Sequence, residues 1–521
     1  MGPSAAQAIR YAEVQVLNSA GNIIQCGTTD GSGAISVDIP QTAGTYTLKV
    51  LSRSNNSYSK ASVLNNPTSM TPYSISASFT LAAAQTTKAV TLTAASYQST
   101  LEGGAFNILD QIYLANEYIR NNSTCASLGN VCTAFTVASK VRVFWTPGLS
   151  PGAYYGSPTS SISFFIPSDD TSLGMATGIY LMGGSNGSTC VDTDHFDNSI
   201  IIHEFGHFLE KTAAYSDSPG GSHSGNGVID PRLAWSEGWS NFLQGAVRGD
   251  NHYIDTHGNQ DCSGGTGVSV SLNLETITAG QDAVSGATYL GEGIFREVSV
   301  SRMLWDTMDS TASTDTYGAD VGFAYIWKVF SDSSSGFANS SVRFRNIGHF
   351  NEFMRALINT SANSHLTDYD NAVSHERQRA DRREYAYLLT AQSGGSCTFD
   401  LQGVSGTSNY AKTNDFMAYY YDGTAAHANI RLVYAATPAG TPTDLDLYVW
   451  SDGYSFTDSS TMAGQSARFY PESGGSGLES ISLSGKSAGY YLIQIMADPD
   501  NVNTTARYYL DTNGGSERLC P

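Results

Sequence analysis

Apolar and polar residues alternate over much of the first part of the chain. Residues 14–16 and 46–50 follow this pattern, and residues 28–33 between them are a cluster of turn-forming residues. A period of two places successive side chains on opposite faces of a β-strand. Residues 74–94 add further alternating segments, so we predict an all-β sandwich over residues 1–97.

The pattern changes near residue 100, where Phe106, Leu109 and Ile112 recur at helical spacing. Three strand-like runs follow, at residues 141–145, 162–166 and 178–182. Later stretches have helical character: residues 199–213, 231–248, 294–308, 321–330 and 351–359. Strands that precede helices in this way predict an α+β domain, which we place at residues 98–395.

From Cys397 onward the chain alternates again, with glycine, serine and aspartate turns between the runs. The runs include DLDLYV at 444–449, ESISL at 479–483 and AGYYLIQI at 488–495. They resemble the bacterial pre-peptidase C-terminal domain, a jelly-roll-like sandwich appended to secreted peptidases. Residues 12–50 resemble carboxypeptidase-regulatory-like or immunoglobulin-like modules. We therefore expect a multidomain chain whose α+β domain is flanked by two all-β sandwiches, the second at residues 396–521.

Charge and composition exclude several classes of partner. The 521 residues include 27 Lys and Arg against 47 Asp and Glu, a net charge of −20. Nucleic acids and anionic membranes both require a basic surface, so neither is expected as a partner. No apolar run reaches the roughly 18 residues of a transmembrane helix. The 40% of hydrophobic residues excludes global disorder.

The cysteines and the low lysine content favour a secreted protein. Six of the seven cysteines form three pairs by position, with Cys26 left over: Cys125 with Cys132, Cys190 with Cys262, and Cys397 with Cys520. Sequence does not fix the connectivity. The last pair, Cys397 and Cys520, lies at the two ends of the C-terminal module. No signal peptide is visible at the start, which we interpret as that of a processed protein.

Residues 203–207, HEFGH, form an HExxH motif inside a predicted helix. Residues four apart lie on one helix face, so His203 and His207 can bind one metal ion. Neutral imidazoles suit Zn²⁺ at ~2.0–2.1 Å. Glu204 projects to the same side and can hold and deprotonate a metal-bound water.

A catalytic zinc site needs a third protein ligand and one open position. The run AWSEGWSNFLQGA places Glu237 on the next predicted helix, between Trp235 and Trp239. These aromatic neighbours predict burial, and a buried unpaired carboxylate is costly. The two motifs together resemble the gluzincin metallopeptidases, in which a second helix supplies a glutamate ligand from an NExxSD-type sequence. The resemblance implies zinc held by His203, His207 and Glu237.

The chain departs from this family pattern at two positions. Ser236 stands where the family has Asn, and Asn241 where it has the Asp that orients a ligating histidine. The loop between the motifs is also longer than in thermolysin-like enzymes. A metzincin pattern would need a further histidine where Lys211 and the residues after it stand, and HxxEH is absent.

Weaker candidates surround these motifs. A gluzincin needs a donor that stabilises the oxyanion, and His223 and Tyr289 are the candidates for it; we expect Arg296 and Trp305 to be structural. In gluzincins an edge strand before the zinc helix binds substrate by β-addition, and residues 178–182 are a candidate for it, although an ordinary sheet strand is the favoured interpretation. Acidic clusters make calcium a second candidate cofactor: Asp192, Asp194 and Asp197; Asp250, Asp255 and Asp261; Asp444 and Asp446.

These patterns lead to one expected function and two alternatives. We expect a secreted, monomeric zinc endopeptidase that hydrolyses peptide bonds of extracellular proteins through a zinc-activated water, with a protein or peptide as substrate. One alternative is a zinc peptidase specialised for glycosylated proteins such as mucins. The other is a non-catalytic adhesion or binding protein.

Overall fold

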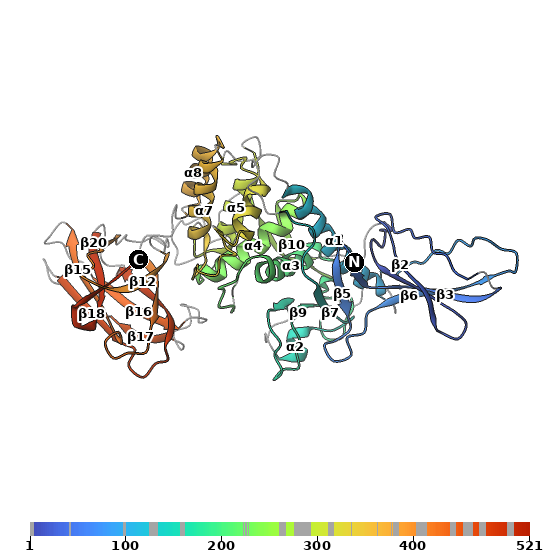
Figure 1. Ribbon diagram of the computed structural model, residues 1–521, viewed down its shortest axis with the longest axis horizontal. Coiled ribbons are helices and arrows are strands. Elements are labelled where there is room, and N and C mark those ends of the chain that lie inside the picture. The colour runs from blue at the N-terminus through green and yellow to red at the C-terminus, as the bar shows by residue number, and fades with distance from the viewer. Residues whose placement is uncertain are drawn as a thin grey trace. The chain divides into compact units, whose positions relative to one another are not determined.

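The computed structural model is multidomain, with several β-sheets and eight α-helices in its described part (Figure 1). Contacts divide the chain into two compact units: unit 1 is residues 1–213 with 243–273, and unit 2 is residues 214–242 with 274–521. The structure describes residues 5–40, 43–96, 101–123, 134–156, 162–221, 223, 227, 229–259, 267–275, 293–310, 317–334, 336–361, 363–376, 378, 385–402, 414–437, 444–451, 462–467, 476–497 and 505–521.

Unit 1 begins with a four-stranded antiparallel sheet in the order β2-β1-β3-β6. Its strands are β1 (Glu13–Leu17), β2 (Ile23–Thr28), β3 (Gly44–Leu51) and β6 (Ser74–Leu81). The predicted alternation of apolar and polar residues is confirmed here, because the apolar residues Val14, Val16 and Val50 are buried. Residues 35–39 and 86–94 join no strand. They line, with this sheet, a hollow of about 1230 Å³.

The second sheet of unit 1 has the order β4-β5-β7-β9-β8. Its strands are β4 (Arg53–Asn55), β5 (Lys60–Leu64), β7 (Val141–Trp145), β8 (Phe164–Ile166) and β9 (Gly178–Leu181). β5, β7 and β9 run parallel, and β8 pairs antiparallel with β9. Strands β4 and β5 therefore come from residues before position 97, and β5 pairs with β7, which follows it.

The strand order decides between the two interpretations of residues 178–182. β9 lies between β7 and β8, and all four of its residues are buried, so it is an ordinary inner strand and not an edge strand. The two edges of this sheet are β4 and β8, each three residues long. A strand with neighbours on both sides has no open backbone edge for a substrate, so a substrate could pair only with an edge strand such as β8.

Helices and a hairpin complete unit 1. α1 (Glu102–Asn122) packs against β5 and α3 (Asn198–Ala213), and α3 also packs against β8, β9 and β10. The 3-10 turn η2 (Asp194–Phe196) precedes α3, and α2 (Pro151–Tyr155) follows β7. β10 (His252–His257) and β11 (Gly267–Asn273) form an antiparallel hairpin. Helix α3, which carries the HExxH motif, therefore lies beside the edge strand β8.

The helical part of unit 2 is built around aromatic residues. Its helices after α4 (Pro231–Arg248) are α5 (Glu297–Met308), α6 (Phe323–Ser331), α7 (Ile347–Thr360) and α8 (Leu366–His375). Trp239 of α4 stacks on Phe330 of α6 with ring centroids 3.8 Å apart, and Trp235 packs edge-on against Phe337 at 4.5 Å. These contacts bury the flanks of Glu237 on α4.

The end of the chain forms a nearly closed, barrel-like sheet. Its strands follow the order β17-β16-β19-β14-β12-β21-β20-β15-β18, and β13 pairs with β20. Their bounds are β12 (Tyr385–Ser393), β13 (Phe399–Gln402), β14 (Asn414–Tyr421), β15 (Asn429–Thr437), β16 (Leu445–Ser451), β17 (Met462–Ser466), β18 (Ser476–Ser482), β19 (Gly489–Ala497), β20 (Thr505–Thr512) and β21 (Glu517–Cys520). Inward-facing residues such as Leu447, Val449 and Ile493 form its core.

The cysteine predictions are confirmed where the structure describes them. Cys397 and Cys520 form a disulfide whose Cα atoms are 5.8 Å apart and whose residues are 123 positions apart. Cys26 is exposed and in no disulfide. Cys190 is disulfide-bonded, whereas Cys125, Cys132 and Cys262 lie outside the described residues. None of the helices in the described part of the chain has the length and hydropathy needed to cross a bilayer.

Candidate metal centre

Helix α3 carries the HExxH motif with its polar residues on one face. His203 and Glu204 are 8% and 6% exposed, and His207 is half-buried. The Nε2 atoms of His203 and His207 lie 3.1 Å apart. Two nitrogens that bind one tetrahedral zinc at ~2.0–2.1 Å are about 3.3 Å apart. The two imidazoles therefore have nearly the spacing that a shared zinc ion requires.

Helix α4 supplies Glu237, which is 7% exposed. Residues 231–242 of this helix belong to unit 2 and residues 243–248 to unit 1. His203, His207 and Glu237 each offer one ligand atom, and these atoms lie within 4.8 Å of one another. Two imidazoles and one carboxylate are a donor set typical of catalytic zinc sites, so the residues present fit this metal.

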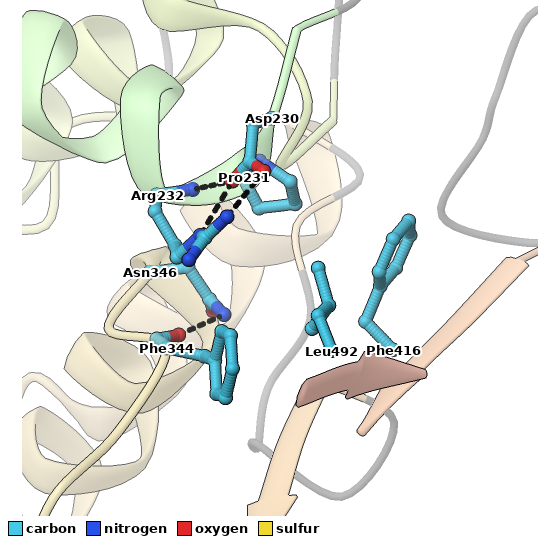
Figure 2. Close-up of a pocket in the computed structure, with 7 residues that line it drawn as sticks. All are labelled: Asp230, Pro231, Arg232, Phe344, Asn346, Phe416 and Leu492. Atoms are coloured by element: carbon cyan, nitrogen blue, oxygen red, sulfur yellow. Dashed lines mark hydrogen bonds and ion pairs between the residues drawn. The ribbon is translucent and has the colours of Figure 1, made fainter. Parts of the chain in front are cut away.

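The start of α4 is fixed by a buried ion pair. Asp230 accepts a hydrogen bond from the backbone N–H of Arg232 at 2.9 Å, which caps the helix, and Pro231 takes the first helical position. The Arg232 guanidinium donates to both oxygens of Asp230, at 3.0 and 2.9 Å. Figure 2 shows this pair beside a pocket of about 10 Å³, roughly the space of one water molecule.

Within unit 2, His223 lies between two buried glutamates. Its Nδ1 is 2.7 Å from Oε2 of Glu297, and its Nε2 is 3.5 Å from Oε1 of Glu237. Glu297 opens α5 and is 4% exposed. The structure thus brings His223 next to a predicted metal ligand. Glu297 was not among the predicted site residues, because a glutamate in the first turn of a helix is common and carries no signal of its own.

The remaining candidates of the sequence have mixed outcomes. Tyr289 lies outside the described residues. Arg296 is 1% exposed and precedes α5, and the indole N–H of Trp305 donates to Glu275 at 3.1 Å. Asn241, which replaces the acidic residue of the family pattern, is 3% exposed on α4.

Acidic residues from two places in the sequence meet in unit 1. Asp192, Asp194 and Asp255 offer oxygens within 4.8 Å of one another. Burial raises the pKa of Asp194 well above its usual value, and the charges of Asp255, Asp197 and Asp192 raise it further. Asp197 accepts instead from the backbone N–H and the hydroxyl of Thr256, both at 2.8 Å. Three of the predicted calcium ligands are therefore grouped.

The other predicted calcium ligands have different surroundings. Asp250 pairs with Arg248 at 3.0 Å, and Asp261 lies outside the described residues. In the C-terminal sheet, Asp444 accepts a hydrogen bond from the hydroxyl of Tyr434 at 2.8 Å. Asp446 accepts one from the hydroxyl of Tyr448 at 3.2 Å.

Comparisons with known proteins give distant structural similarity alone. No family model matches the sequence, and no curated protein matches it. Among solved structures, the chain is similar to the pre-peptidase C-terminal domain of a collagenase from Bacillus anthracis, with 13% sequence identity and a TM-score of 0.15. The match covers 25% of this chain and 99% of that one.

Proposed function

We propose that this protein is a secreted zinc endopeptidase that hydrolyses extracellular proteins, with an α+β zincin-like domain flanked by accessory β-sandwiches. The observation that carries the proposal is the grouping of His203, His207 and Glu237 within 4.8 Å, with Glu204 between the two histidines on α3. This set supplies metal ligands and a general base in one buried place, which a binding protein does not need.

Glu204 is the proposed catalytic base. Bound zinc would polarise the scissile carbonyl and lower the pKa of a water molecule. The carboxylate of Glu204 would hold that water, accept its proton and pass the proton to the leaving amine. Because Glu204 is 6% exposed, its charge acts in a region of low dielectric constant, where electrostatic effects are strong.

The edge strand β8 is the proposed site of substrate alignment. It is antiparallel to β9 and packs against α3, where Phe165 meets Phe208 edge-on with ring centroids 6.0 Å apart. A substrate chain that pairs with the open side of β8 would run along the helix that carries the metal ligands. Backbone pairing explains how diverse sequences could be accepted.

The first test measures proteolysis and metal content together. We expect purified protein to contain zinc, to hydrolyse casein, to lose activity with 1,10-phenanthroline and to regain it with added Zn²⁺. A phenanthroline isomer that does not chelate is the matched control. Absence of hydrolysis by zinc-loaded protein on a broad set of denatured proteins would favour the adhesion alternative and contradict the proposal.

A second measurement addresses the substrate class and calcium. The cleavage rate of one mucin-type glycoprotein is measured before and after enzymatic removal of its glycans. A general peptidase should cleave the deglycosylated form at least as fast, whereas a glycoprotein-specific peptidase should cleave only the glycosylated form.

Calcium is proposed as a structural cofactor at the group of Asp192, Asp194 and Asp255. Added Ca²⁺ should raise the melting temperature of the wild type and should not raise that of Asp255→Asn.

A further inference from the structure

Two buried glutamates of unit 2 are held side by side by close packing of their helices. A Cβ atom on Gly238 of α4 would lie 2.5 Å from Cγ1 of Val300 and 2.9 Å from the backbone oxygen of Glu297. Only glycine allows α4 and α5 to approach this closely. The neighbouring Glu237 and the first residue of α5, Glu297, are thereby brought to one imidazole.

This imidazole completes a donor set for a metal ion. His223, Glu237 and Glu297 each offer one ligand atom, and these atoms lie within 4.8 Å of one another. A divalent cation at this place would add two positive charges beside Glu237 and Glu297, which are 7% and 4% exposed. Charge compensation of this kind stabilises buried carboxylates.

We propose that His223, Glu237 and Glu297 form a second zinc site, in which Glu237 is shared with the His203 and His207 group. A carboxylate has two oxygens and can bridge two ions, and paired metal ions in hydrolases are about 3.5–4 Å apart. Imidazole nitrogen with carboxylate oxygen suits zinc better than calcium, which prefers oxygen alone. The rival arrangement is a protonated His223 that simply bridges two carboxylates.

The proposal rests on the proposed function only in sharing Glu237, and metal content tests it without an activity assay. Full-length, tag-free protein is stripped with a chelator and dialysed against buffered Zn²⁺ over a range of free concentrations. We expect the wild type to bind two zinc ions, one of them more weakly. His223→Ala and the isosteric Glu297→Gln should each bind one.

Two further variants make the outcomes distinct. His365→Ala, which removes a half-buried histidine from the start of α8, should still bind two ions. His203→Ala/His207→Ala should keep one ion, which Glu297→Gln then removes. A wild type that binds a single ion, or a Glu297→Gln variant that still binds two, would overturn the second site while leaving the peptidase proposal intact. Loss of both ions in His203→Ala/His207→Ala alone would overturn an independent second site as well.

Discussion

Glu204 is the residue at which metal binding and chemistry can be separated. Glu204→Gln keeps the shape of the side chain and removes no proposed metal ligand. We expect zinc content and melting temperature to remain unchanged while kcat falls by ~10²–10⁴, because general-base catalysis is lost. Glu352→Gln on α7, the same chemical change away from the proposed site, should stay close to wild-type activity. Near-normal kcat in zinc-loaded Glu204→Gln would exclude this role.

Asp110 on α1 gives a pH dependence that is independent of the metal. Burial raises the pKa of its carboxyl to about 6, and Arg10, 3.5 Å away, lowers it only in part. The folded state therefore binds this proton more tightly than the unfolded state does. Its contribution to stability is complete below about pH 4 and is lost as the pH rises to about 6, a change on the order of 3 kcal/mol.

Asp110→Asn removes this titration. Relative to the wild type, the variant should gain stability between pH 4.5 and pH 7.5, which urea unfolding followed at both pH values would show. Comparison at each pH cancels the contributions of the other groups. A difference between variant and wild type that is the same at the two pH values would contradict the assignment.

At the level of elements, the approach of α4 and α5 depends on Gly238. Gly238→Ala should destabilise the fold by ~1–3 kcal/mol, because its Cβ overlaps Val300. Adding Val300→Ala frees space, so the double variant should be more stable than the sum of the two single changes predicts. Urea unfolding of all four proteins measures this coupling, and strict additivity would show that the two residues do not limit the approach.

Helices α3 and α4, which carry the proposed metal ligands, could be predicted because the sequence patterns that mark them are local. The expected helix at 199–213 appears as α3 at Asn198–Ala213, and α4 has the predicted bounds, since Pro231 and the apolar periodicity mark them. Strand β7 likewise has its predicted bounds. Pairing between distant strands could not be predicted in this way: β5 pairs with β7 although 76 residues lie between the end of β5 and the start of β7.

The place of Glu297 beside His223 could not be predicted from the sequence for the same reason. Glu297 reaches His223 because α4 and α5 pack closely at Gly238, and no periodicity encodes a contact between residues 74 positions apart. The position of β9 inside its sheet follows from the pairing of the short strand β8, which sequence alternation does not specify. Local patterns were therefore enough to propose the HExxH residues and Glu237, whereas Glu297, which only packing brings to this place, was not proposed.

For the molecule as a whole, we expect the disulfide to separate the stability of the C-terminal sheet from that of the proposed metal centre. A bridge over 123 residues restricts the unfolded chain by roughly 4–5 kcal/mol on the chain-entropy model. Cys397→Ser/Cys520→Ser should lower the first calorimetric transition and leave zinc content unchanged. Cys26→Ser, which removes the exposed thiol, is the control and should change neither. Zinc loss on removal of the bridge would contradict this separation.

The hollow in the N-terminal module has a consequence for the lifetime of the protein if it has the proposed peptidase activity. Residues 35–39 and 86–94 line it. Residues 35–39 and 89–94 alternate between half-buried and exposed positions, and residues 86–89 are all exposed. Neither segment makes a backbone–backbone hydrogen bond within the described part of the chain. Unpaired, accessible backbone is what a peptidase cleaves most readily. A concentrated stock of active protein should therefore digest itself at these segments, whereas Glu204→Gln stored beside it stays whole. The molecule's first substrate would be its own amino-terminal module.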